Sequence, residues 1–288
     1  MLNHLLGILF DGVAYGSLLF LISIGLAVTL GLMNFINLAH GSFAMLGGYV
    51  CVLAMTRAGM PFFAALLLAF VAGGLAGALF ERVLYRRVYQ RSHLDQVLFT
   101  IGLVFMSIAS AAYLFGPAQQ PMHLPDYLSG QVNVAGVDLG IYRLFLIGAV
   151  ALITLSLTWL IEHTRFGAQV RAAVDNRVAA EGLGIDVARV FSVTFALGSA
   201  LAALGGGLAI DVLGLDPTFP LKYMVYFLLV VAVGGARTIK GPLIAALILG
   251  VFDVAGKYYV PEVGSFIIYA LMVMMLVLFP GGLFGRRG

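Results

Sequence analysis

Few residues of this chain could do chemistry, and the most notable group lies inside an apolar stretch. His40 stands in the run Phe-Ile-Asn-Leu-Ala-His-Gly-Ser, where asparagine side chains can hydrogen-bond across helices. An ionisable group within an apolar span costs roughly 2.5 to 3.5 kcal/mol to insert into a membrane, so it is a candidate for function. We therefore predict a polar pathway, with a structural polar cluster as the alternative, formed by Asn34, Asn37, His40, Gly41 and Ser42.

Three aspartates belong to other apolar stretches. Asp253 is followed by Lys257 one helical turn later, and this spacing favours a local ion pair. Asp11 and Asp211 are expected near the surfaces of the membrane.

Signatures of several kinds of enzyme site are missing. The sequence has no Gly-x-x-x-x-Gly-Lys-Ser/Thr loop, so the chain is not expected to hold nucleotide phosphates or to hydrolyse ATP. It has no His-Glu-x-x-His motif, and its single cysteine, Cys51, excludes an internal disulfide and a cysteine metal cluster. The nucleophile elbow of hydrolases is also missing. We expect no catalytic, cofactor-binding or metal-binding residues.

The composition is that of a membrane protein. Of 288 residues, 62% are hydrophobic and 10% are charged, against roughly 25% charged in soluble domains. The apolar runs last about 17 to 25 residues, enough to cross as helices, and they lack the alternating polarity of barrel strands. We therefore predict an all-α polytopic transmembrane bundle of about eight to nine spans. It forms a single domain over residues 1–288.

The positions of the spans and of the arginines predict the orientation of the chain. Both arginine-containing connections should be cytoplasmic, and the connection over residues 116–140, which has no Lys or Arg, should lie on the opposite face. The tail with Arg286 and Arg287 then falls inside. Because the basic residues orient helices in this way, the net charge of +3 does not indicate nucleic-acid binding. The expected spans are 5–32, 35–55, 62–80, 97–115, 141–161, 190–212, 221–235, 243–256 and 264–279.

Two of these spans are candidates for broken or re-entrant helices. The second carries polar residues and a glycine over residues 37–42, and the seventh is short and ends in Gly234 and Gly235. Non-helical backbone at membrane depth is tolerated only when it is buried in protein or lines a wet cavity. Small residues at helical spacing elsewhere predict close helix packing or a moving seam. They are Gly12, Gly16, Gly73, Gly77, Gly198, Ala202 and Gly206.

The most specific feature is a charged, helix-forming island over residues 162–190. Residues 169–181 contain no Gly or Pro, and we predict one amphipathic helix there. Its apolar face would hold Val170, Ala173, Val174 and Val178, Arg171 could pair with Asp175, and Gly182 would supply a left-handed cap. From composition alone this helix fits a docking site for a soluble partner or a surface helix at the lipid headgroups.

Three separate segments then carry a family resemblance that covers essentially the whole chain. The first is Asn-Leu-Ala-His-Gly at 37–41 with Met-Leu-Gly-Gly-Tyr at 45–49, and the second runs from 171 through 185 into the glycine-rich helix ending at 207. The third joins Val-Gly-Gly at 233–235 to Gly-Pro at 241–242. In these segments the chain resembles the permease subunits of ATP-binding-cassette importers for branched-chain amino acids, of the shorter-permease type. Residues 237–240 depart from the family pattern, which has more small residues there, and this weakens the substrate assignment.

The resemblance implies partners and a mechanism. Two ATP-binding-cassette ATPase subunits would hydrolyse ATP, and a second paralogous permease and an extracytoplasmic substrate-binding protein would complete the importer. The chain, in the bacterial cytoplasmic (inner) membrane, would move substrate by alternating access and bind no cofactor itself. The implied ATPase-coupling residues are Ala179, Ala180, Glu181, Gly182, Leu183, Gly184 and Ile185.

Two readings from other classes remain open. One is a self-contained channel or ion-coupled secondary transporter, which commonly places its sites at discontinuous helices near the midplane. The scarcity of buried acids argues against coupling to protons or sodium ions. The other is a membrane scaffold without transport.

Overall fold

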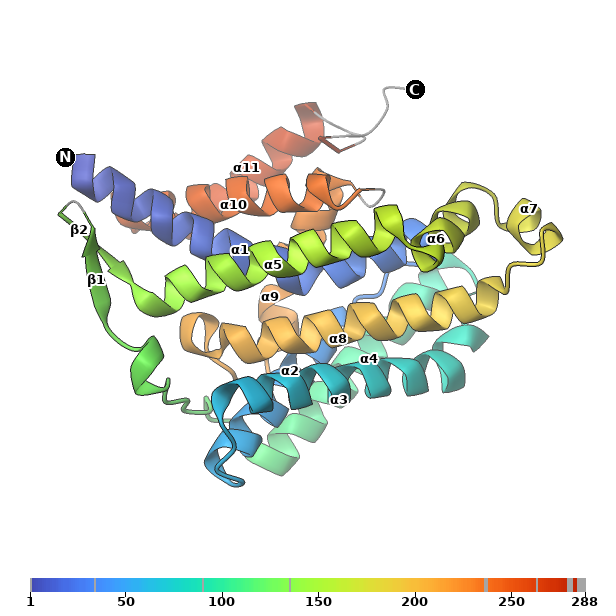
Figure 1. The fold of residues 1–288 in the computed structure, drawn as a ribbon, viewed down its shortest axis with the longest axis horizontal. Coiled ribbons are helices and arrows are strands. Elements are labelled where there is room, and N and C mark those ends of the chain that lie inside the picture. Colours follow the sequence, from blue (N-terminus) through green and yellow to red (C-terminus); the bar gives the residue numbers. More distant parts are fainter. Residues whose placement is uncertain are drawn as a thin grey trace.

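The chain folds almost entirely into helices, so the predicted all-α class is confirmed (Figure 1). A computed structural model describes residues 2–33, 35–89, 91–134, 136–235, 238–262, 264–278 and 282–283. Asn34, Arg237, Arg286 and Arg287 lie outside the described residues. The α-helices are α1 (Leu2–Met33), α2 (His40–Thr56), α3 (Phe62–Val83), α4 (His93–Phe115), α5 (Ile141–His163), α6 (Arg165–Asp175), α7 (Arg177–Gly182), α8 (Val187–Leu213), α9 (Phe219–Gly234), α10 (Lys240–Tyr259) and α11 (Gly264–Leu278).

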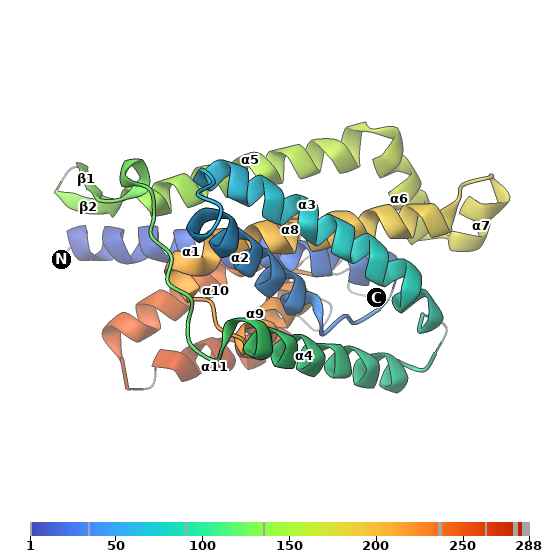
Figure 2. The ribbon, with the colours of Figure 1, turned by 90° about the horizontal axis from the view of Figure 1, so that it is seen from below.

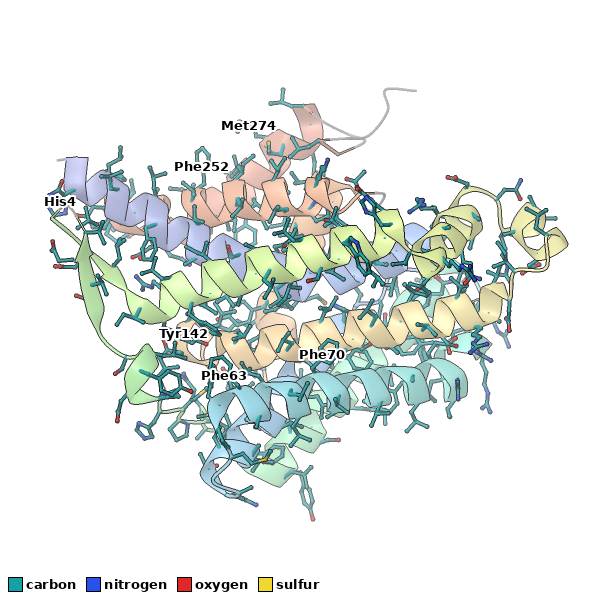
Figure 3. The ribbon with its side chains drawn as sticks, in the orientation of Figure 1. His4, Phe63, Phe70, Tyr142, Phe252 and Met274 are labelled. Carbon is teal, nitrogen blue, oxygen red and sulfur yellow. The ribbon has the colours of Figure 1, made fainter. Side chains whose placement is uncertain are left out.

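Six of these helices are long and apolar enough to cross a membrane, namely α1, α3, α4, α5, α8 and α10. Helices α2, α9 and α11 are apolar but shorter, so the count of eight to nine spans stays a prediction. Large apolar side chains cover much of the outer surface, as expected of a protein that contacts lipid. Figure 3 labels three of them, Phe63, Phe252 and Met274, each about half exposed.

The second predicted span is helical over only part of its length. Residues 35–39 are not helical, and α2 begins at His40. The turn is stabilised locally because the Asn37 side-chain oxygen accepts a hydrogen bond from the Ala39 amide at 3.1 Å. Asparagine favours such turns because its side chain can replace a backbone partner.

Helix α8 is the centre of the bundle and is buried along most of its length against α1, α2 and α3. Close approach depends on small residues, since a Cβ at Gly206 would overlap the carbonyl oxygen of Ala44 in α2. A Cβ at Gly198 would lie 3.1 Å from the Cα of Gly25 in α1. Without a hydrophobic force between helices in lipid, such backbone approach supplies much of the packing attraction.

A second close seam joins α1 to α10. A Cβ at Gly250 would lie 2.5 Å from the Cα of Gly16, and one at Gly12 would lie 2.6 Å from the Cα of Val251. The small residues singled out in the sequence on α1 and α8 therefore pack against other helices of the same chain.

The bundle has two distinct ends (Figure 2). The hairpin end carries the N-terminus and a short antiparallel hairpin of β1 (Gln131–Val134) and β2 (Val137–Gly140). The arginine-rich end carries α6, α7 and the 3-10 helix η1 (Tyr85–Arg87) that follows α3. A second 3-10 helix, η2 (Asp126–Leu128), precedes the hairpin. The two arginine-containing connections thus share one end, and the connection over residues 116–140 lies at the other, as predicted.

Candidate functional site

The charged island forms a segment that projects from the arginine-rich end of the bundle (Figure 1). Helix α6 begins at an N-cap, where the Thr164 hydroxyl accepts from the Gly167 amide at 3.1 Å. Gly167 is required for this tight turn out of α5, because a Cβ would overlap the carbonyl oxygen of Ile161. The Arg171 guanidinium donates to the same carbonyl oxygen. The predicted pairing of Arg171 with Asp175 is not among the ion pairs of the described residues.

The prediction of one helix over residues 169–181 is wrong, because the chain breaks at Asn176. This residue has φ −155° and ψ 100°, and its side-chain oxygen accepts from the Ala179 amide at 3.0 Å, which caps the N-terminus of α7. Asparagine is among the best N-cap residues, so the signal was present in the sequence. The break also removes Val178 from the predicted apolar face. Val170 and Ala173 are buried, whereas Val178 is 79% exposed.

Helix α7 ends in a Schellman motif, and Gly184 rather than the predicted Gly182 takes the left-handed conformation. Gly184 has φ +84°. Its amide donates to the carbonyl oxygen of Glu181, and the Ile185 amide donates to that of Ala180, each at 3.0 Å. These are the two bonds that define the motif. The turn gives residues 177–185, here named the α7 tip, a defined shape.

The α7 tip presents apolar side chains to its surroundings. Leu183 is 81% exposed and Val178 is 79% exposed, beside an ion pair of 2.9 Å between Arg177 and Glu181. Of the predicted coupling residues, Ala180 is buried and Ile185 is half-buried, while the remainder are exposed: Ala179, Glu181, Gly182, Leu183 and Gly184. Large apolar groups with a polar rim on a projecting surface are typical of a protein interaction site.

A small separate core joins the α7 tip to the start of α8. Ala180 packs with residues of α6 and α8, and the Arg177 guanidinium lies 5.5 Å from the centre of the Phe191 ring. The buried members of this core are Val170, Ala173, Ala180, Val187, Val190 and Phe191. The tip is therefore packed against the helix that forms the centre of the bundle.

The start of α8 is tied in turn to α3 by a polar network that the sequence did not reveal. Glu81 is 1% exposed and receives the Arg86 guanidinium at 3.0 Å and the Ser192 hydroxyl at 2.5 Å. Arg86 also donates to the Ser192 hydroxyl oxygen at 2.6 Å. A buried carboxylate needs such partners. Glu81 lies just beyond the predicted span over residues 62–80, so no pattern in the sequence indicated this network.

The predicted pathway residues hold α2 against its neighbours. The Asn37 side-chain oxygen accepts from the Tyr85 hydroxyl at 3.1 Å, and His40 Nε2 lies 2.9 Å from the carbonyl oxygen of Ile22. Ser42 shares a hydrogen bond of 2.7 Å with Ser107 of α4.

Gly41 lets α9 approach, since a Cβ there would lie 3.1 Å from the Cα of Pro220. Asn37, His40 and Gly41 are buried, an arrangement that favours the structural alternative in this conformation. Their role in a pathway stays a prediction.

Four charged side chains form two ion pairs at the hairpin end, and the sequence predicted one of these pairs. Lys257 donates to Asp253 at 2.5 Å, as the spacing of the two residues indicated. Asp11 of α1 pairs with Arg143 of α5, a contact between distant segments that no local pattern could reveal. Both pairs line one cavity of about 220 Å³.

Comparison with known proteins gives a consistent result. The sequence profile of the family described as branched-chain amino acid transport system / permease component matches residues 8–276. The high-affinity branched-chain amino acid transport system permease protein LivH of Salmonella typhimurium is 30% identical, over 96% of this chain and 94% of that protein. The protein BraD of Pseudomonas aeruginosa, with the same description, is 26% identical over 98% and 96%. No solved structure matches the chain.

Proposed function

The chain belongs to the family of branched-chain amino acid transport system permease components, and we propose that it is the transmembrane subunit of an ATP-driven importer for branched-chain amino acids. It is a multi-pass membrane protein, and the bacterial relatives indicate the cytoplasmic (inner) membrane as its site. The relatives' names support the substrate class, because they are described as branched-chain amino acid permeases over nearly their whole lengths.

The observation that carries the ATP-driven part of the proposal is the exposed α7 tip. Val178 and Leu183 are large apolar side chains that no other part of the described chain covers, on a segment that projects from the bundle. Fully burying such a side chain is worth about 1.5 to 3 kcal/mol, so a groove on an ATPase subunit would gain from covering them. Arg177 and Glu181 stand beside them and could form the polar rim of that interface.

The packing behind the tip supplies a route by which an ATPase could move the bundle. A push on the tip reaches α8 through the small core around Ala180, and α8 is packed against α1, α2 and α3. Tightly packed helices shift between discrete arrangements rather than bending continuously. Alternating access would follow when paired ATPases close on ATP and drive α8 between two such arrangements.

The complete importer would contain partners beyond this chain. We expect two ATP-binding-cassette ATPases, which bind and hydrolyse the ATP, a second paralogous permease and an extracytoplasmic substrate-binding protein. No nucleic-acid partner is proposed, and no cofactor is assigned to this chain.

Affinity purification in mild detergent tests the assembly. The tagged chain is purified at native expression level beside a Val178→Asp/Leu183→Asp double variant, and all associated proteins are identified by mass spectrometry. We expect an ATPase and a second permease with the unaltered chain. The double variant should lose the ATPase, because carboxylates would be forced into an apolar groove, and should keep the second permease.

A matched control places the same change at the other end of the molecule. Val132→Asp/Val134→Asp alters two exposed valines of β1 and should leave the ATPase bound. Purification of the chain without any ATPase would refute the importer and favour a self-contained channel or ion-coupled transporter. ATPase retention by the tip variant would refute the docking site alone.

A further inference from the structure

The cavity at the hairpin end contains a carboxyl group whose hydrogen bonding is incomplete. Asp253 is 1% exposed, and one carboxylate oxygen, Oδ2, accepts from Lys257. The other oxygen, Oδ1, is buried, and no donor among the described residues reaches it. A buried carboxylate oxygen without a partner is costly, so a ligand that donates a hydrogen bond there would be favoured.

The cavity is lined by two acids and two bases from three helices. Asp11 comes from α1, Arg143 from α5, and Asp253 and Lys257 from α10. The Lys257 ammonium also lies 5.6 Å from the centre of the Tyr15 ring, a position that cation–π attraction stabilises. The formal charge of these walls is zero, which suits a ligand that carries one positive and one negative group.

The charged side chains of the cavity suit a ligand with an ammonium and a carboxylate group better than a lone metal cation. A lone metal cation would find both carboxylates already paired with a base, and the positive charges of Arg143 and Lys257 would oppose it. An ammonium group can donate to Asp253 Oδ1 once this carboxyl group turns toward the cavity, because Oδ1 has almost no exposed surface in this conformation. A carboxylate can accept from Arg143 or Lys257, whose side chains are nearly half exposed. Val212 and Val254 form an apolar part of the wall, against which an aliphatic side chain can pack.

We propose that this cavity binds the ammonium and carboxylate groups of the transported amino acid at the hairpin end, with Asp253 as the ammonium acceptor. Its volume of about 220 Å³ is several times the roughly 30 Å³ that one water occupies in the liquid, so the cavity has room for more than a single water or ion. The inference rests on the proposed function, because it takes the ligand to be the transport substrate.

Ligand binding to the purified complex in phosphatidylcholine nanodiscs tests the site. Saturation-transfer NMR measures L-leucine, leucinamide, which lacks the carboxylate, and 4-methylpentanoate, which lacks the ammonium. We expect L-leucine to bind, and each truncated ligand to bind at least tenfold more weakly. Asp253→Asn keeps the shape of the side chain and should weaken L-leucine binding at least tenfold.

The control variant is Asp126→Asn, which alters an exposed aspartate at the same end and should leave binding unchanged. If Asp253→Asn does not accumulate as a folded protein, Arg143→Gln carries the test. Its ion pair with Asp11 is partly exposed, and its loss should weaken binding of L-leucine but not of leucinamide.

Three results would overturn the inference. They are no binding of L-leucine to the unaltered complex, unchanged binding in both Asp253→Asn and Arg143→Gln, and a cavity occupied by co-purified phosphatidylethanolamine, whose headgroup also carries one positive and one negative group. The first of these together with ATP-dependent uptake by the same complex rejects this site alone. Absence of both uptake and any ATPase partner rejects the proposed function itself.

Discussion

Gly182 and Gly184, the two glycines at the end of α7, should differ in how much their replacement by alanine destabilises the α7 tip. Gly184 has φ +84°, a conformation that costs an alanine about 1 to 2 kcal/mol, whereas Gly182 is a helical residue without positive φ. A Cβ would meet no atom within 4 Å at either position, so no steric term enters. Both changes replace Gly by Ala, so their effects on the open state of the α7 tip largely cancel in a comparison.

The difference between the variants is therefore about 1 to 2 kcal/mol, or about 5- to 30-fold in the opening equilibrium of the α7 tip. Hydrogen exchange of the Ile185 amide reports it, because this amide donates to Ala180 in the motif. We expect faster exchange in Gly184→Ala than in Gly182→Ala by that factor. Gly184→Asn should lie between them, since asparagine tolerates the left-handed region.

Equal exchange in the two alanine variants, or faster exchange in Gly182→Ala, would refute the Schellman assignment. The first result would mean that the turn contributes nothing to the order of the tip. The second would restore Gly182 as the cap residue that the sequence predicted.

Three further perturbations test the seam of α8 with α2, the network around Glu81 and the cap of α7. Gly206→Ala should destabilise the bundle by about 1 to 3 kcal/mol, because its Cβ would overlap backbone of α2. The control Gly148→Ala, whose Cβ would meet no atom within 4 Å, should have little effect on thermal unfolding in detergent. Equal losses in the two variants would contradict this seam. Ser192→Ala removes a partner from the buried Glu81 and should lower the free energy of unfolding by about 1 to 3 kcal/mol. Ser192→Thr keeps a hydroxyl group and should keep most of that stability. An unchanged midpoint of thermal unfolding in the alanine variant would show that the network is not formed. Asn176→Ala removes the cap of α7 and should speed hydrogen exchange of the amide of residue 179 by an amount equivalent to about 0.5 to 2 kcal/mol. Asn176→Asp, which keeps a capping oxygen, is the conservative control. Protection of this amide that survives in the alanine variant would argue for one continuous helix.

Features set by local chemistry could be predicted from the sequence. Long apolar runs must become helices in lipid because their backbone groups find no other partners, and this determined the all-α class and the approximate spans. The ion pair between Asp253 and Lys257 follows from a spacing of four residues on one helix. The charged island stood out because its composition differs from everything around it.

Other features depend on which segments the fold brings together. Glu81 lies 111 residues from Ser192, and Asp11 meets Arg143 from another helix, so neither pairing leaves a trace in local periodicity. The break at Asn176 had a local signal in the asparagine cap, whereas the small core that α6 and α7 share with the start of α8 joins residues that no local pattern links. Gly184 and not Gly182 turns left-handed, because α7 continues through Gly182 and the turn falls two residues later. Composition and periodicity thus determined what the elements are, while the tertiary structure decided which buried charges and turns they share, because such pairings depend on distances across the bundle and not along the chain.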